Sequence, residues 1–105
     1  MRLRENKRYL HVLVEGERLG EGEAKRLLSQ AVLETLGELG AAKAAFAFKA
    51  FDAERQEAVV KCTTKSMEEV IAALSLKRFF EGRDVALRLQ KIAGSFSPAR
   101  GKKRN

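Results

Sequence analysis

The chain has 105 residues, of which 21 are lysine or arginine and 14 are aspartate or glutamate, so its formal net charge is +7. This length suits a single domain, and a hydrophobic content of 45% excludes wholesale disorder. No apolar run approaches the roughly 20 residues of a membrane span, and no signal-peptide pattern follows the charged N-terminus.

The excess charge is concentrated at the two ends of the chain. Residues 1–8 hold four basic residues and one acidic residue, and residues 98–105 hold four basic residues and no acidic one. Between these segments the chain is formally neutral, with 13 charges of each sign. We therefore predict a basic N-terminal arm at 1–8, one α+β domain at 9–97 and a basic C-terminal tail at 98–105. Such arms typically bind phosphate with a salt-dependent affinity, and the alternative is that they serve solubility alone.

The first half of the domain predicts a strand, a helix and a second strand. Residues 9–15 are rich in β-branched and aromatic side chains, which indicates a strand. From Ala24 onward, apolar residues at i, i+3 and i+4 spacing indicate a helix that stops between Gly37 and Gly40 through a glycine cap. Residues 43–51 place phenylalanines at period two, which favours a strand over a helix.

The second half repeats this order of strand, helix and strand. A polar loop at 52–56 and a return strand at 57–64 complete a hairpin. Ser66 and Glu69 have the spacing of a capping box, so a second helix is expected from Met67 to Phe80, ended by Gly82. Residues 84–90 form the last predicted strand.

The resulting order, β-α-β-β-α-β, predicts an α+β fold of the ferredoxin-like or RRM-like sandwich class. That fold has a four-stranded antiparallel sheet with both helices packed on one face. In the usual strand order of this class the last strand lies beside the first. The two basic segments would then meet on the same half of the domain.

The face of the sheet without helices needs a separate explanation. We expect Tyr9, Leu13, one set of phenylalanines from residues 43–51 and part of the last strand to lie there. A contiguous apolar patch at this face would serve a protein partner or self-association. The alternative is that the terminal segments fold back over it.

Residues suited to catalysis are few. One histidine, His11, and one cysteine, Cys62, are too few for a metal cluster of usual ligand spacing. They could meet across strands as a thiol–imidazole pair, but a packed cysteine is the favoured interpretation. The glycines between Gly16 and Gly22 lack a nucleotide-binding spacing. We therefore predict no catalytic residue, no metal ligand and no cofactor in the chain itself, and the lone cysteine favours a reducing, cytoplasmic location.

Base recognition by stacking also has little support in the sequence. The aromatic residues that RNA-recognition motifs carry on their two central strands are absent, and Tyr9 is the one candidate stacking residue. If RNA is bound, we expect electrostatics and shape to dominate over direct reading of bases.

Four segments of the chain carry patterns of one family, in order and at compatible spacing. They are KRYL at 7–10, AVLETLGELGAAKA at 31–44, VKC at 60–62 and IAGSF at 92–96. Together these segments resemble archaeal ribonuclease P protein component 2, the counterpart of the eukaryotic Pop-five subunit, and the run at 31–44 is the most specific. One position departs from the family pattern, because Ala93 stands where the family has a serine. No role of that serine is carried over to this chain.

The resemblance implies a subunit of ribonuclease P, which removes the 5′ leader of precursor tRNA. It implies that the RNA subunit performs a magnesium-dependent hydrolysis, and that the protein stabilises this RNA and neutralises its phosphates. The implied partners are ribonuclease P RNA, protein component 3, precursor tRNA as the holoenzyme's substrate, and a second copy of the component pair, with no membrane. On this hypothesis the RNA-binding residues are Arg2, Arg4, Lys7, Arg8, Tyr9, Lys91, Ser95, Arg100, Lys102, Lys103 and Arg104.

Two other classes of function stay open at this point. The first is a ferredoxin-like ligand-sensing or regulatory module that assembles through its sheet, which would need a concave pocket with convergent polar groups. The second is a chaperone for nucleic acid or an architectural DNA binder, which would prefer duplex DNA to precursor tRNA.

Overall fold

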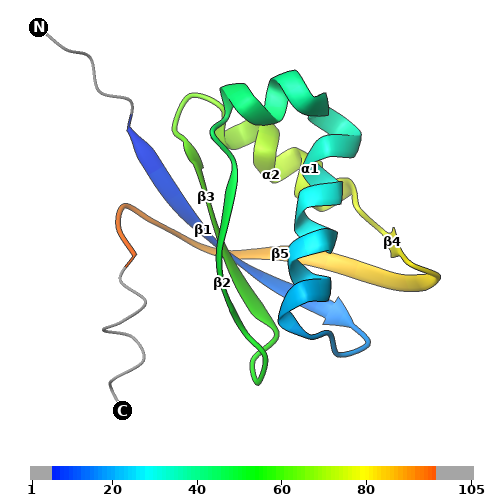
Figure 1. The fold of residues 1–105 in the computed structure, drawn as a ribbon. Coiled ribbons are helices and arrows are strands. Elements are labelled where there is room, and N and C mark those ends of the chain that lie inside the picture. The colour runs from blue at the N-terminus through cyan, green and yellow to red at the C-terminus, as the bar shows by residue number, and fades with distance from the viewer. Residues whose placement is uncertain (1–5, 97–105) are drawn as a thin grey trace, which may run out of the picture.

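The computed structural model describes residues 6–96 and places seven elements along them (Figure 1). These are β1 (Lys7–Gly16), α1 (Glu21–Lys43), β2 (Ala47–Asp52), β3 (Glu57–Thr63), α2 (Met67–Leu76), β4 (Phe79–Phe80) and β5 (Arg83–Ala93). The strands pair antiparallel in the order β2-β3-β1-β5-β4. The predicted α+β class is confirmed, the last long strand lies beside the first, and the sheet has five strands instead of four.

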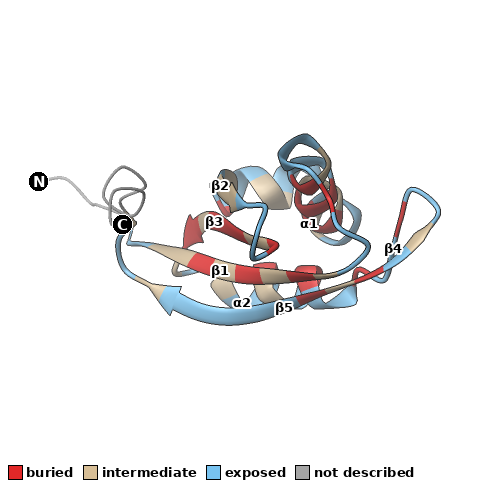
Figure 2. Cartoon of the chain, turned by 90° about the horizontal axis from the view of Figure 1, so that it is seen from below, coloured by how far each residue is buried: buried red, intermediate tan, exposed pale blue. Residues whose placement is uncertain are grey.

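The core lies between the two helices and one face of the sheet. Strand alternation places Leu10, Val12 and Val14 of β1 on this face, and all three are buried. They pack in one cluster with the apolar stripe of α1, whose buried members are Ala24, Leu27, Leu28, Ala31 and Val32. In Figure 2 the buried stretches of β1 and α1 are red, whereas the second half of β5 is exposed. The predicted placement of both helices on one face follows from this single core.

The first helix does not stop at the glycines. Gly37 has a left-handed φ of 75° and interrupts the helical backbone, but the chain resumes helical turns as far as Lys43. The partial burial of Leu36 and Ala41 against the core explains why the extra turns form. As a consequence β2 begins at Ala47, four residues later than the predicted start at Lys43.

The second helix is shorter than predicted, because it ends at Leu76 instead of Phe80. Lys77 adopts extended backbone, and its ammonium donates to both carboxylate oxygens of Glu34 at 3.0 and 3.1 Å, which ties the helix end to α1. The next residues form β4, and Phe80 enters the core with 1% of its surface exposed. Glu81 and Gly82 both have positive φ, as the two central residues of a tight hairpin require.

The capping box predicted at Ser66 is wrong. The Ser66 side chain makes no cap hydrogen bond, because its backbone (φ −104°, ψ 8°) lacks the extended conformation that aims an N-cap hydroxyl at the first turn. The backbone N–H of Ser66 instead donates to Thr63 Oγ1 at 3.3 Å. At the other helix, Glu23 reaches back to accept a hydrogen bond from the Gly20 N–H at 3.0 Å.

Candidate nucleic-acid interface

The face of the sheet opposite the helices is open, and the strand register identifies the residues on it. Tyr9, His11 and Leu13 of β1 point to this face and are each partly buried. Their neighbours on β3 are Lys61 opposite Tyr9 and Val59 opposite His11. Their neighbours on β5 are Ala93 opposite Tyr9, Lys91 opposite His11 and Arg88 opposite Leu13.

This face is less apolar than predicted, since the phenylalanines of the second strand lie on the other side. Phe46, Phe48 and Phe51 all pack against the core. The register between β2 and β3 shifts between Phe48 and Ala50, so that Phe48 pairs with Val60 and Phe51 with Ala58, both core residues. The residue inserted by this bulge, Lys49, breaks the period of two on which the prediction relied.

Three lysines stand at one end of the open face. Lys7 begins β1, Lys61 lies on β3 and Lys91 lies on β5. None of the three forms an ion pair with another residue in the range 6–96. We call this region, formed by Lys7, Tyr9, His11, Lys61, Lys91 and Phe96, the basic end.

Three rings meet at the basic end. The Phe96 ring lies 5.8 Å from the Tyr9 ring, centroid to centroid, at an interplanar angle of 35°. It also lies 6.3 Å from the His11 ring in an edge-on arrangement of 74°. The segment that follows β5 therefore does return over part of the open face, as the fold-back alternative expects. Sequence reasoning missed Phe96; Gly94, which follows the last predicted strand and favours a turn, was the available signal.

The electrostatic setting of His11 favours its neutral form. Partial burial lowers the pKa of the imidazole below 6.5, the nearby Lys91 ammonium lowers it further, and Glu57 opposes both. The charge of His11 is thus sensitive to any anion that neutralises Lys91.

His11 and Cys62 do not form a thiol–imidazole pair. Cys62 pairs in register with Arg8 and is fully buried on the helix side, whereas His11 points to the open face. Burial raises the pKa of the Cys62 thiol, which keeps it protonated. The interpretation of Cys62 as a packed core residue is confirmed.

The predicted RNA-binding residues divide into those within the structure and those outside it. Lys7, Tyr9 and Lys91 come together at the basic end, with Ser95 exposed in the following turn. Arg8 points to the other side of β1 and its guanidinium donates to the Lys7 carbonyl at 2.9 Å. Outside the described residues lie Arg2, Arg4, Arg100, Lys102, Lys103 and Arg104. Lys61 and His11 complete the basic end and were not among the predicted residues.

The points where the two terminal segments join the described domain are neighbours. Tyr9, near the start of β1, pairs with Ala93, the last residue of β5. The Asn6 carbonyl accepts hydrogen bonds from both the backbone N–H and the hydroxyl of Thr64, each at 2.9 Å. These bonds fix the start of β1 to the end of β3, beside the basic end.

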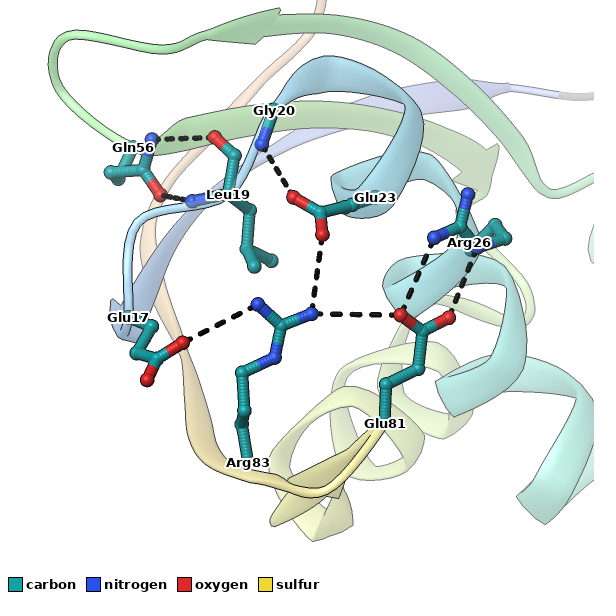
Figure 3. A network of polar contacts seen from close by, with 8 residues as sticks. All are labelled: Glu17, Leu19, Gly20, Glu23, Arg26, Gln56, Glu81 and Arg83. Carbon is teal, nitrogen blue, oxygen red and sulfur yellow. Dashed lines mark hydrogen bonds and ion pairs between the residues drawn. The ribbon is translucent and has the colours of Figure 1, made fainter.

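The opposite end of the same strands holds a network of paired charges (Figure 3). The Arg83 guanidinium lies 3.4 Å from Glu17, 3.2 Å from Glu23 and 3.5 Å from Glu81, and Arg26 pairs with Glu81 at 3.2 Å. We call these five residues the ion-paired end. The Gly20 N–H and the Arg83 guanidinium both hold the pKa of Glu23 below its usual value.

Gln56 ties this end to the β2–β3 hairpin (Figure 3). Its side-chain carbonyl accepts the Leu19 N–H at 2.8 Å, and its amide donates to the Leu19 and Ala53 carbonyls at 3.0 and 2.8 Å. The loop before α1 is thereby fixed to the sheet, and the charges of the ion-paired end are held in place by buried hydrogen bonds.

The described part of the chain contains neither a cluster of metal-ligating side chains nor a membrane-spanning helix. Within residues 6–96, no group of three or more histidine, cysteine, aspartate or glutamate side chains is placed to hold a metal ion. No helix in the same range is long and apolar enough to cross a membrane.

The fold and the basic end define an α+β sandwich whose open sheet face carries lysines and aromatic rings at one end. Comparison with known proteins gives the particular family: the chain belongs to the Rpp14/Pop5 family, whose profile matches residues 8–102. It is 36% identical over 94 residues to ribonuclease P protein component 2 of Thermococcus gammatolerans, covering 89% of this chain and 78% of that protein. The proteins of the same name from Pyrococcus furiosus and Thermococcus kodakarensis are 32% and 34% identical, with the same coverage.

A solved structure supports the fold. A chain in the cryo-EM structure of yeast ribonuclease MRP superposes with a TM-score of 0.69, covering 90% of this chain and 79% of that chain. Only 8% of the residues are identical, so this likeness shows a shared fold. The family that the sequence resembles is thus confirmed by the family profile and by the named relatives.

Proposed function

We propose that this chain is a protein subunit of ribonuclease P that binds the RNA of the holoenzyme through the basic end of its sheet. Family membership carries the assignment to ribonuclease P. The observation that supports the mode of binding is that Lys7, Lys61 and Lys91, which form no ion pair within residues 6–96, lie beside the points where both basic segments join the domain. Phosphates bound there would release counterions, which gives an affinity that falls steeply with salt.

The chemistry of precursor tRNA cleavage belongs, on this proposal, to the RNA subunit with its magnesium ions. The protein contributes positive charge and a rigid surface on which the RNA is held in its active fold. His11 and Cys62 lie on opposite faces of the sheet, so this thiol and this imidazole are not placed to act as a nucleophile–base pair.

The helix side of the domain is the proposed site of protein contacts. Leu39, Leu76 and Phe79, which belong to α1, α2 and β4, expose 79%, 66% and 56% of their surface. Protein component 3 and a second copy of the component pair are the proposed partners, in the cytoplasm of an archaeal cell. RNA and protein partners could then bind at the same time.

Reconstitution tests the proposed function directly. The full chain and component 3 are added to the ribonuclease P RNA, and precursor tRNA cleavage is measured at low magnesium, with RNA alone as the control. We expect faster cleavage with the proteins present. Cleavage no faster than with RNA alone would contradict the assignment.

A salt titration tests the role of the basic segments. If about five phosphates are neutralised, log K should fall with log salt at a slope of about −3.5 to −4.5. A chain shortened to residues 6–96 should show a flatter slope with an unchanged thermal unfolding midpoint. An unchanged slope would remove the terminal segments from the RNA interface.

A further inference from the structure

The three rings of the basic end are not part of the core. Tyr9 and His11 lie two residues apart on the open face of β1, and Phe96 reaches them from the segment after β5. All three are only partly buried, so each keeps ring surface accessible to solvent. The core on the helix side is complete without them, since Phe80, Leu10 and Leu27 fill it.

The cations beside these rings are placed on both flanks. Lys61 is opposite Tyr9 on β3, and Lys91 is opposite His11 on β5, each one strand spacing of about 5 Å from β1. The carboxylates on the same face lie toward the other end, where Glu15 is bonded to Arg88 at 3.0 Å and Glu57 lies 3.8 Å from Arg55. Lys61 and Lys91, neither of which forms an ion pair with another residue in the range 6–96, therefore flank the rings, and Glu57 is the carboxylate that acts on His11 from farther along the face.

We propose that the basic end binds an unpaired RNA nucleotide, with its base stacked on the Tyr9–Phe96 pair and the adjacent phosphates on Lys61 and Lys91. Aromatic rings stack on any base whose π-face is free, and lysines along the same path follow the backbone. A base inside a duplex has both faces covered by its neighbours, so a helical RNA segment would use the lysines alone. The inference rests on the proposed function and deepens it, because it names a single-stranded element as the part of the RNA that is recognised.

Fluorescence anisotropy with three labelled RNAs of equal length tests the inference. They are a mixed-sequence single strand, the same strand with abasic sites at its central positions, and the corresponding duplex. The protein is the full chain, compared with the double variant Tyr9→Leu/Phe96→Leu, which keeps apolar bulk and removes the aromatic faces. Leu13→Ala is the matched control, because Leu13 lies on the same strand and face but outside the ring cluster.

We expect the double variant to bind the intact single strand at least tenfold more weakly, while its affinity for the abasic strand and the duplex and its salt slope stay unchanged. The control variant should bind all three RNAs as the parent does. Equal losses on all three RNAs, or no loss on the intact single strand, would overturn the inference. Thermal unfolding checks the fold, and if the double variant does not fold, Phe96→Leu alone provides the test, with the same selective loss in smaller measure.

The failure of this inference can be told apart from the failure of the proposed function. If the double variant retains full affinity for the single strand while the parent chain still accelerates cleavage in the reconstituted holoenzyme, the nucleotide site is wrong and the function stands. If the parent chain neither binds RNA nor accelerates cleavage, both proposals fail.

Discussion

The two ends of the β1–β5 strand pair differ in how their charges are arranged. At the ion-paired end, Arg83 is shared among three glutamates, and buried hydrogen bonds of Gln56 hold the adjoining loop. At the basic end, about 30 Å away along β1 at the usual rise per residue, the lysines have no carboxylate partner among the described residues. The comparison separates charge that serves the fold from charge that remains available to a ligand.

The net charge of the chain does not reveal this division. The segment 9–97 is formally neutral, yet its charges are unevenly placed: two arginines meet three glutamates at the ion-paired end, whereas Lys61 and Lys91 have no ion-pair partner among the described residues. Exposed ion pairs contribute little to stability, and the net negative charge of the ion-paired end lies at the opposite end of β1 from the lysines. Changes at the two ends should therefore have different consequences.

The largest expected effect is on stability at the ion-paired end, where Phe80 fills the core beneath Arg83. Phe80→Ala should lower the free energy of unfolding by about 3–5 kcal/mol, because a buried aromatic side chain is removed and a cavity remains. Its neighbour Phe79, 56% exposed, is the matched control, and Phe79→Ala should cost less than about 1 kcal/mol. Urea unfolding of both variants measures the difference, and equal losses would contradict the assignment of β4.

The next effect is on RNA binding at the basic end. Lys61→Gln/Lys91→Gln removes two charges but keeps much of the side-chain bulk, so the slope of log K against log salt for a single strand should flatten by about 1.4. The unfolding midpoint should stay as it is. Lys25→Gln/Lys43→Gln, two exposed lysines on α1, is the control with the same loss of charge. Should the α1 variant flatten the slope equally, net charge rather than the basic end determines binding.

A smaller effect concerns acid stability. The lowered pKa of Glu23 contributes stability that is present above pH 4.5 and is lost as the pH falls below that value. Arg83→Met removes one cause of the lowered pKa and leaves the Gly20 hydrogen bond, so the variant should lose less stability than the parent between pH 7 and pH 3. Urea midpoints at these two pH values measure the change. A variant with the same acid sensitivity as the parent would show that Arg83 does not act on Glu23 in solution.

The smallest effect is the titration of His11, the single histidine, which an NMR titration follows without ambiguity. Its pKa should lie below 6.5 in the free protein. The folded state should therefore lose stability as the pH falls below 6.5, because the unfolded chain then binds the proton more readily than the folded chain does. Lys91→Ala should raise this pKa, and so should a bound single-stranded RNA whose phosphate neutralises Lys91. A pKa that RNA leaves unchanged would place the phosphates away from Lys91.

Much of the fold could be predicted because long periodic segments decide it. The spacing of apolar residues in α1 and the alternation in β1 each indicate one structure, and the order of elements leads to the α+β sandwich. The errors in the predicted elements lie where a single residue changes which face of a strand the following side chains occupy or where a turn begins. The insertion of Lys49 puts Phe51 on the same core-facing side as Phe48. Glu81-Gly82 forms a tight turn for which Asn-Gly or Asp-Gly is the usual signal, so the sequence predicts a helix where β4 lies.

The candidate site could be predicted only in part, for a related reason. Tyr9 begins one predicted strand and Lys91 directly follows another, and both lie near the basic segments, which is why they could be identified. Lys61 and Phe96 join them through the pairing register and through a turn after β5, neither of which the local sequence determines. Residues gathered from three separate segments become one site only when the sheet is assembled.

The irregularity between β1 and β5 has a consequence for how this chain can change in length. Val12 pairs with Leu89 and His11 with Lys91, so Gln90 is the inserted residue. Deletion of Gln90 would leave all remaining side chains of β5 on the faces that they now occupy. Deletion of Arg88 would instead turn the residues beyond it to the opposite face. Among relatives, insertions and deletions of single residues in the sheet should therefore occur most often at Gln90 and at its counterpart Lys49. At these two positions a change in length leaves the core residues and the residues of the open face where they are.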